Sequence, residues 1–212
     1  MMDQNQIGKF ETLDKRRSRG IETRNQILAS AITCIATKGL SKTTLDRVAE
    51  LANVSRALVV FHFRSKNQLF SAALDYLGKA YATGWDAVAF RQHASPMEKL
   101  LDLVEFDVRF AYQNPEYVSA WHAFWGEANG NSLYAEQSAP RDARYAKVFQ
   151  SLIAEQLENE GRDREQVPYI SHALFCMLFG IWVSSHLEPD PDGLEYGLAT
   201  ARTFLKNAFP KC

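Results

Sequence analysis

The chain has 212 residues, 46% of them hydrophobic, which is enough for one large domain or two modest ones around a substantial core. No apolar run reaches the roughly 18–20 residues of a membrane span, and no signal peptide is recognisable, so we expect a cytoplasmic protein with no membrane partner. The three cysteines, Cys34, Cys176 and Cys212, cannot all pair and have no metal-like spacing, which is consistent with a reducing compartment.

Charge is divided unevenly along the chain. Residues 1–81 contain 13 Lys or Arg and 7 Asp or Glu, a net charge of +6. Residues 82–212 contain 11 Lys or Arg and 18 Asp or Glu, a net charge of -7. A basic front end on an acidic body predicts an N-terminal nucleic-acid-binding module and a body that avoids phosphate.

Residues 1–20 are polar and end in a cluster of Lys and Arg. They are expected to form either a solvated, disordered terminus or a flexible basic arm that binds phosphates or the minor groove. The two interpretations are compatible if the arm becomes ordered only on DNA. From residue 21 to about 38, apolar side chains recur on one helical stripe before Gly39, which predicts a supporting helix: Ile27, Leu28, Ala31, Cys34 and Ile35.

Residues 44–63 predict two short helices joined by a tight turn. Thr44 and Ser55 are suitable N-caps, and Asn53 tolerates the left-handed backbone needed between the helices. The outward positions of the second helix are expected to be Arg56, Ala57, Phe61 and Val60. This pattern is typical of a helix-turn-helix, whose second helix enters the DNA major groove.

A fourth helix is predicted from Ser65 to about residue 91. Lys66 lies in its first turn, where the helix dipole disfavours a cation unless a phosphate lies nearby. About 25 residues is too long for a small helix-turn-helix domain, so the far half should belong to the body and link the two parts.

The rest of the chain predicts helices only. Their expected ranges are 96–113, 115–126, 133–160, 167–186 and 194–209. The helix at 167–186 is apolar nearly all round, and the last helix has apolar side chains on two sides. Faces of this kind must be covered, which predicts a homodimer through the last two helices.

The N-terminal 60 residues resemble the TetR family of bacterial transcriptional regulators. The resemblance rests on Thr23-Arg-Asn-Gln-Ile-Leu28, Gly39, Thr43-Thr44, Val48-Ala49, Val54-Ser55, His62-Phe63, Ser65-Lys66 and Leu69. Members of the family usually have Gly at position 53, Gly or Pro at 57 and Tyr at 60, where this chain has Asn53, Ala57 and Val60. The missing Tyr hydroxyl removes one usual phosphate contact.

The C-terminal body resembles the subgroup that contains the choline-responsive betaine-operon repressor, through Ala120-Trp-His-Ala-Phe-Trp125 and Gly180-Ile-Trp182. The resemblance implies an all-α homodimer with about nine helices per chain, whose last two helices form a four-helix bundle between subunits. The implied organisation is an arm at 1–20, a helix-turn-helix domain at 21–81 and a ligand-binding and dimerisation domain at 82–212.

The family motif places seven residues at DNA, namely Thr44, Arg47, Ser55, Arg56, Phe61, His62 and Lys66. Arg56 is the candidate for bidentate reading of guanine, whereas Thr44, His62 and Lys66 are expected at phosphates. The alternative is that His62 only packs in the domain and that Arg47 is a solvated surface charge.

Aromatic residues in the body are candidates for an effector site near Glu105 and Asp107, since aromatic faces and a carboxylate suit a quaternary ammonium. The candidates are Phe106, Tyr112, Trp121, His122, Phe124, Trp125 and Trp182. The alternative is an ordinary aromatic core.

We therefore expect a DNA-binding regulator that a small-molecule effector, such as choline or a related quaternary ammonium, releases from a palindromic operator. It could instead be an activator or act without a ligand. The rival class is a helical enzyme or small-molecule carrier with an incidental helix-turn-helix. The chain lacks a nucleophile motif, a phosphate loop and a His pair suited to metal, so we expect no enzyme activity, cofactor or metal.

Overall fold

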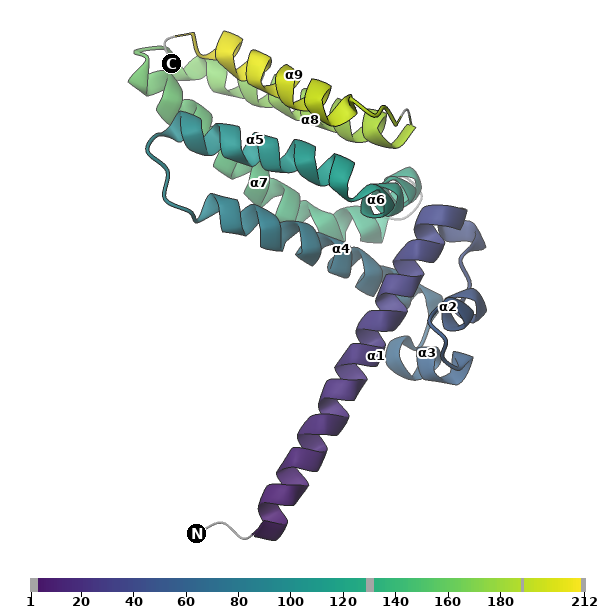
Figure 1. The fold of residues 1–212 in the computed structure, drawn as a ribbon. Coiled ribbons are helices and arrows are strands. Elements are labelled where there is room, and N and C mark those ends of the chain that lie inside the picture. The colour runs from purple at the N-terminus through teal and green to yellow at the C-terminus, as the bar shows by residue number, and fades with distance from the viewer. Residues whose placement is uncertain (1–3, 129–131, 188, 211–212) are drawn as a thin grey trace. The chain divides into compact units, whose positions relative to one another are not determined.

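The computed structural model describes residues 4–128, 132–187 and 189–210, and the regular structure within these ranges is entirely helical (Figure 1). The helices are α1 (Gln4–Lys42), α2 (Leu45–Leu51), α3 (Arg56–Phe63), α4 (Lys66–Ala89), α5 (Pro96–Gln113), α6 (Pro115–Ala128), α7 (Ser132–Asn159), the short 3-10 helix η1 (Arg164–Gln166), α8 (Val167–Leu187) and α9 (Gly193–Ala208). The expectation of an all-α fold with about nine helices is confirmed.

The chain forms two compact units, one up to Tyr76 and one from Leu77 onward. Helix α4 runs through the division, so its first turns belong to the first unit and its remainder to the second. It is therefore the covalent and helical link between them, as its length predicts.

In the first unit, α1 supplies the buried stripe expected from the sequence, including Ile27, Leu28, Ala31 and Ile35. Gly39 leaves helical geometry with φ 75°, which ends the continuous part of α1 where the sequence predicts a stop. Helix α1 begins much earlier than the predicted residue 21, because residues 4–20 are also helical. The role of this segment as a basic arm stays a prediction.

The turn between α2 and α3 follows the sequence-based prediction. Asn53 has φ 52°, the left-handed conformation that Asn accepts more readily than most residues. Gln26 on α1 donates a 2.7 Å hydrogen bond to the carbonyl oxygen of Ala52, which ties the end of α2 to the supporting helix. The backbone conformation of Asn53 and the hydrogen bond from Gln26 together stabilise the turn between α2 and α3.

The second unit is built around α5, which packs against α7, α8 and α9. Its buried face includes Leu100, Leu103, Val104 and Val108, none of which is measurably exposed. Asp107 lies on the same face and is also buried. Residues 103, 104, 107, 108 and 111 share one helical stripe, so Asp107 occupies a core position of α5.

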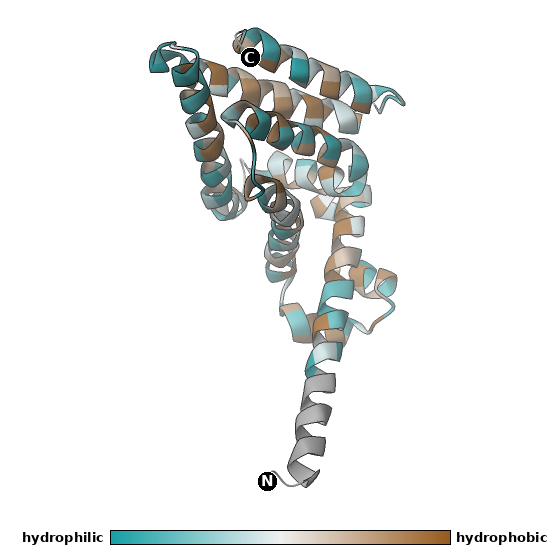
Figure 2. Cartoon of the chain, turned by 60° about the vertical axis from the view of Figure 1, so that its left-hand side comes forward, coloured by the Kyte–Doolittle hydropathy of each residue, from teal (hydrophilic) through white to brown (hydrophobic). Residues whose placement is uncertain are grey.

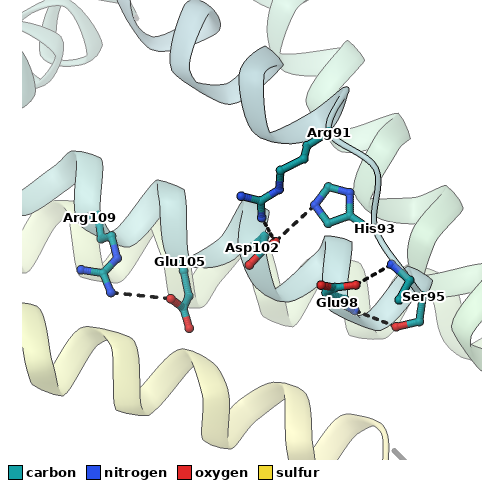
Figure 3. Close-up of polar contacts among 8 residues, drawn as sticks. Arg91, His93, Ser95, Glu98, Asp102, Glu105 and Arg109 are labelled. Carbon is teal, nitrogen blue, oxygen red and sulfur yellow. Dashed lines mark hydrogen bonds and ion pairs between the residues drawn. The ribbon is translucent and has the colours of Figure 1, made fainter.

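The connection between α4 and α5 is held by polar contacts (Figure 3). Ser95 caps α5 by accepting a 3.1 Å bond from the backbone N–H of Glu98, whose carboxylate in turn accepts from the backbone N–H of Ala94. Arg91 and His93 both point toward Asp102, with His93 Nε2 at 3.2 Å from its carboxylate. These contacts fix the start of α5 relative to the end of α4.

Helix α8 is largely hydrophobic (Figure 2), and the described chain leaves several of its large apolar side chains exposed. Tyr169, Phe175, Phe179 and Leu187 are exposed by 77%, 65%, 46% and 68%. Contrary to the sequence-based expectation, Arg164–Leu187 is long and apolar enough to cross a membrane by length and composition, with a mean hydropathy of 1.5. One such helix is weak evidence for a membrane span, because a helix face that another subunit covers has the same composition.

Candidate DNA-binding and effector sites

Helix α3 presents a distinct outer face. Val59 and Phe63 are buried against the first unit, whereas Arg56, Ala57 and Phe61 are exposed, with Phe61 at 77%. Val60 is half-buried beside them. A large aromatic side chain that is this exposed contributes nothing to the core of its own unit, so this face is available to a partner.

Arg56 is engaged with a neighbour in this structure. Its Nε lies 3.1 Å from Asp46 Oδ1 on α2, and both side chains are well exposed, by 61% and 71%. An ion pair in water contributes little to stability, so it can open at low cost.

Four of the other candidate DNA contacts lie at helix starts. Thr44 accepts from the backbone N–H of Arg47 at 3.3 Å, and Ser55 accepts from that of Leu58 at 3.2 Å, so both act as the predicted caps. The guanidinium of Arg47 donates to the Lys42 carbonyl at 2.6 Å. Lys66 reaches the Ser41 carbonyl at 3.3 Å and lies 5.1 Å from the centre of the Phe70 ring.

His62 lies between the exposed and buried sides of α3, with its ring in contact with Phe61 and Phe63. Partial burial lowers the pKa of His62, and the nearby positive charge of Arg24 lowers it further. A neutral imidazole can donate one hydrogen bond to a phosphate but brings no charge. The structure therefore supports the packing role proposed for His62 at least as well as a phosphate contact.

In the second unit, a cluster of aromatic rings surrounds Tyr81 of α4. The centre of the Tyr81 ring lies 5.1–5.9 Å from the centres of five other rings: Phe106 and Phe110 of α5, Trp121 of α6, Tyr145 of α7 and Trp182 of α8. These five contacts join α4 to four different helices of the body. We refer to Tyr81 and these five rings as the aromatic cage.

The aromatic cage encloses one carboxylate. Tyr81 donates a 2.7 Å hydrogen bond to Asp107 Oδ1, and the side chain of Trp182 also donates to Asp107. Burial raises the pKa of Asp107 to about 6, and these two hydrogen bonds oppose the rise. Among the described residues, no Lys, Arg or His forms an ion pair with it. A buried carboxylate without a cation is costly, so this arrangement favours a cationic ligand.

The structure brings together three of the seven predicted effector residues, Phe106, Trp121 and Trp182. His122 and Trp125 form an adjoining group, in which the ring of His122 stacks on His186 at 4.9 Å and that of Trp125 lies 6.2 Å from Trp182. His122 and the Trp182 carbonyl are 3.3 Å apart. Burial is the main cause that lowers the pKa of His122.

The remaining two predicted effector residues lie elsewhere. Tyr112 sits at the far end of α5 against α9, where its ring fills the space beside Gly193 and Gly197. Phe124 is buried against Tyr134 of α7, with ring centres 5.1 Å apart. Both positions are those of packing residues. A shallow hollow of about 380 Å³ along α9, between Pro191 and Arg202, has no aromatic lining and is separate from the cage.

Sequence reasoning named Asp107 as one of two carboxylates near the effector site but did not include Tyr81, Phe110 or Tyr145. Of the two carboxylates, the structure places Asp107 among the rings, at a core position of α5. Tyr81 carried a weaker signal, since it lies between Gly78 and Gly84 on one face of α4. A β-carbon on Gly84 would lie 2.6 Å from Phe106 Cε2, so the glycine is needed for this close approach of α4 to α5.

Comparisons with known families agree with this division of the chain. Residues 27–73 match the family described as bacterial regulatory proteins of the tetR family. Residues 96–210 match the family described as BetI-type transcriptional repressor, C-terminal. The two matches fall in the first and second units respectively.

Curated relatives include HTH-type transcriptional regulator BetI from Cronobacter sakazakii, which is 27% identical over 85% of each chain. BetI from Rhizobium meliloti is 28% identical over 86% of this chain and 87% of its own. The probable acrEF/envCD operon repressor of Escherichia coli is 39% identical, but only over 57 residues, or 27% of this chain.

Solved structures share the fold. A transcriptional regulator from Pseudomonas aeruginosa PAO1 has a TM-score of 0.77 at 16% identity and covers 89% of this chain and 90% of its own. A transcriptional regulator from Saccharomonospora viridis, solved in complex with choline, also has a TM-score of 0.77, at 20% identity, and covers 87% of this chain and 96% of its own.

The BetI-type match alone covers more than half of the 212 residues, and the relatives are transcriptional regulators rather than enzymes. Together with the helix-turn-helix of the first unit, these findings establish the chain as a TetR-family transcriptional regulator of the BetI type.

Proposed function

We propose that this regulator is a repressor that leaves its operator when a quaternary ammonium compound, of which choline is the simplest candidate, binds in the aromatic cage. The observation that carries the proposal is Asp107, a buried carboxylate that has no ion-pair partner among the described residues and whose hydrogen bonds come from two of the surrounding aromatic side chains. The choline complex of the structurally similar S. viridis regulator supports it.

DNA recognition is assigned to the outer face of α3. Arg56 would leave Asp46 and read guanine, since a guanidinium matches the O6 and N7 acceptors of that base. Thr44, Arg47, Ser55, Lys66 and, more weakly, His62 would hold phosphates around it, while Phe61 would contact thymine methyl groups. These roles follow from the exposure of the residues and from the family motif.

A homodimer is needed to place two recognition helices on one palindromic site, about 34–36 Å or one DNA turn apart. We assign its interface to α8 and α9, because Tyr169, Phe175 and Phe179 of α8 and Tyr196 of α9 are large, exposed and apolar. A second copy would cover the surface that gives α8 its membrane-like composition. The protein is then expected to be cytoplasmic.

Release from DNA would begin at the cage. The rings are packed against one another, with Phe110 and Trp182 stacked at 5.8 Å and only 13° apart in orientation. A cation sits within about 6 Å of each ring centre that it contacts, so it cannot enter between these rings without separating them. Because Tyr81 is on α4, that separation would displace the helix that continues into the DNA-binding unit.

The direct test is calorimetry with choline, followed by a gel shift on DNA from the region upstream of the gene, with and without choline. We expect heat of binding and loss of the shifted band at saturating choline. A coupling of about 1–3 kcal/mol between the sites is enough for this response. If no quaternary ammonium compound produces heat or releases the DNA, the proposed effector class is wrong.

A further inference from the structure

The aromatic cage has a second charge at its border. Arg141 of α7 lies over Trp121, with its Cζ 5.9 Å from the ring centre. Trp121 meets Tyr81 edge to face, and Tyr81 carries the hydrogen bond to Asp107. The negative charge of Asp107 and the positive charge of Arg141 therefore border the same pair of rings.

The guanidinium of Arg141 is largely enclosed, since only 21% of its side chain is exposed. It lies against α4 at Gly78, where a β-carbon would come within 2.1 Å of Nη1. Burial raises the pKa of Tyr81 well above its usual value, and the positive charge of Arg141 opposes that rise. Arg141 is thus close to the cage and occupies a position that only glycine on α4 leaves open.

Arg141 lacks a strong partner among the described residues. Its Nε donates at 3.3 Å to the carboxylate of the adjacent residue Asp142, whose side chain is 61% exposed. An ion pair to an exposed neighbour in the chain is weak, and the two terminal nitrogens of the guanidinium make no hydrogen bond that the described residues provide. A planar guanidinium in this condition is suited to bind a carboxylate or phosphate.

The two charges do not neutralise each other. Arg141 pairs with Asp142. The pKa of Asp107 is set by its burial and by its hydrogen bonds from Tyr81 and Trp182, without a contribution from Arg141. A ligand with only a positive charge would be attracted by Asp107 and repelled by Arg141. A ligand with both charges would satisfy both residues.

We infer that Arg141 is the second pole of the effector site and that the effector is a zwitterion, namely a quaternary ammonium joined by a short linker to a carboxylate or phosphate. The inference rests on the proposed function, because the ammonium group would occupy the cage beside Asp107. Arg141 then determines specificity by binding the anionic group at the border of the cage, against Trp121 and Gly78.

Two pairs of compounds test this inference, since the members of each pair share a trimethylammonium group and differ in the anion. The first is glycine betaine and its methyl ester, and the second is phosphocholine and choline. We expect the wild-type protein to bind the anionic member of one pair at least about ten-fold more tightly in calorimetry. The pair that shows the preference identifies the carboxylate or the phosphate as the anion.

Arg141→Gln should abolish that preference. Gly78→Ala should weaken it independently, because the methyl group displaces the guanidinium while alanine favours the helix. The matched control is Arg164→Gln, the same change at an exposed guanidinium of η1 that pairs with Glu158 of α7, and it should keep the wild-type preference. Thermal unfolding followed by circular dichroism checks that each variant is folded.

The outcomes separate the inference from the function on which it rests. If choline and the ester bind the wild-type protein as tightly as their anionic counterparts, the cation site stands and the role of Arg141 is refuted. An unchanged preference in both Arg141→Gln and Gly78→Ala refutes it as well. If none of the four compounds binds, both the cation site and the zwitterion inference fall.

Discussion

At the scale of single residues, some candidate DNA-contacting side chains are already hydrogen-bonded within the DNA-binding unit, whereas others are exposed and weakly held. Thr44 and Ser55 are occupied as helix caps. Among the residues that the structure describes, Arg56 pairs only with the exposed carboxylate of Asp46, and Phe61 projects into solvent. We assign base recognition to Arg56 and Phe61, because an exposed ion pair such as that of Arg56 can exchange its partner at little cost.

Arg56→Ala should therefore relax the choice of operator sequence and weaken specific binding by about 1–3 kcal/mol. Lys66→Ala should weaken all DNA sequences about equally, since a phosphate contact does not read the base. Gel shifts with the operator and with point-mutated operators measure both effects. Equal operator preference in Arg56→Ala and in the wild-type protein would remove Arg56 from base reading.

Asp107 makes stability depend on pH in a direction opposite to that of an ordinary salt-bridged carboxylate. Its pKa is raised from 3.8 to about 6 in the folded protein, so the unfolded chain loses this proton at lower pH than the folded one. The free energy of unfolding should fall as pH rises from about 4 through 6, by up to roughly 3 kcal/mol for this group.

Asp107→Asn removes that titration and can keep a hydrogen bond from Tyr81. It should raise the free energy of unfolding relative to the wild-type protein at pH 8, and the difference should shrink as the pH falls toward 4. Urea unfolding at several pH values measures this. A difference that is independent of pH would mean that Asp107 is not a buried titrating group.

At the scale of elements, the sequence predicted the helices from α2 to α9 because apolar spacing and caps agree along the chain, whereas the polar residues 4–20 of α1 and the short η1 carry no such pattern. Ser95 and Pro96, for example, start α5 at the predicted residue. The cage was harder to predict. It is assembled from α4, α5, α6, α7 and α8, and helical periodicity shows which residues of one helix share a face but not which faces of different helices meet. Tyr112 and Trp121 look equivalent in sequence, yet the first packs on α9 and the second on Tyr81.

The uncovered face of α8 makes a prediction at this scale. Phe175→Glu places a charge on a side chain that is 65% exposed in the single chain and that we assign to the dimer interface. It should convert the dimer to a monomer in analytical ultracentrifugation, because burying an unpaired charge is costly. Phe90→Glu, at an 81% exposed position after α4, is the matched control and should leave the dimer intact. A dimeric Phe175→Glu protein would place the interface elsewhere.

At the scale of the whole molecule, one helix connects the DNA-binding unit to the proposed effector site. The first turns of α4 belong to the DNA-binding unit, and Gly78, Tyr81 and Gly84 receive side chains from the body: Arg141, the rings around Asp107, and Phe106. The division of charge along the sequence already predicted a basic DNA-binding front and an acidic body. The position on α4 of the proposed effector site could not be predicted, since it depends on contacts between distant parts of the chain.

The central claim is that a quaternary ammonium acts through Asp107 to release DNA. It is tested most directly by titrating choline and glycine betaine into protein–operator complexes of the wild-type protein and Asp107→Asn, with release followed by fluorescence anisotropy. We predict that at least one compound releases the wild-type protein and that Asp107→Asn binds the operator normally but requires at least about ten-fold more of that compound. Release of both proteins at the same concentration would contradict the claim.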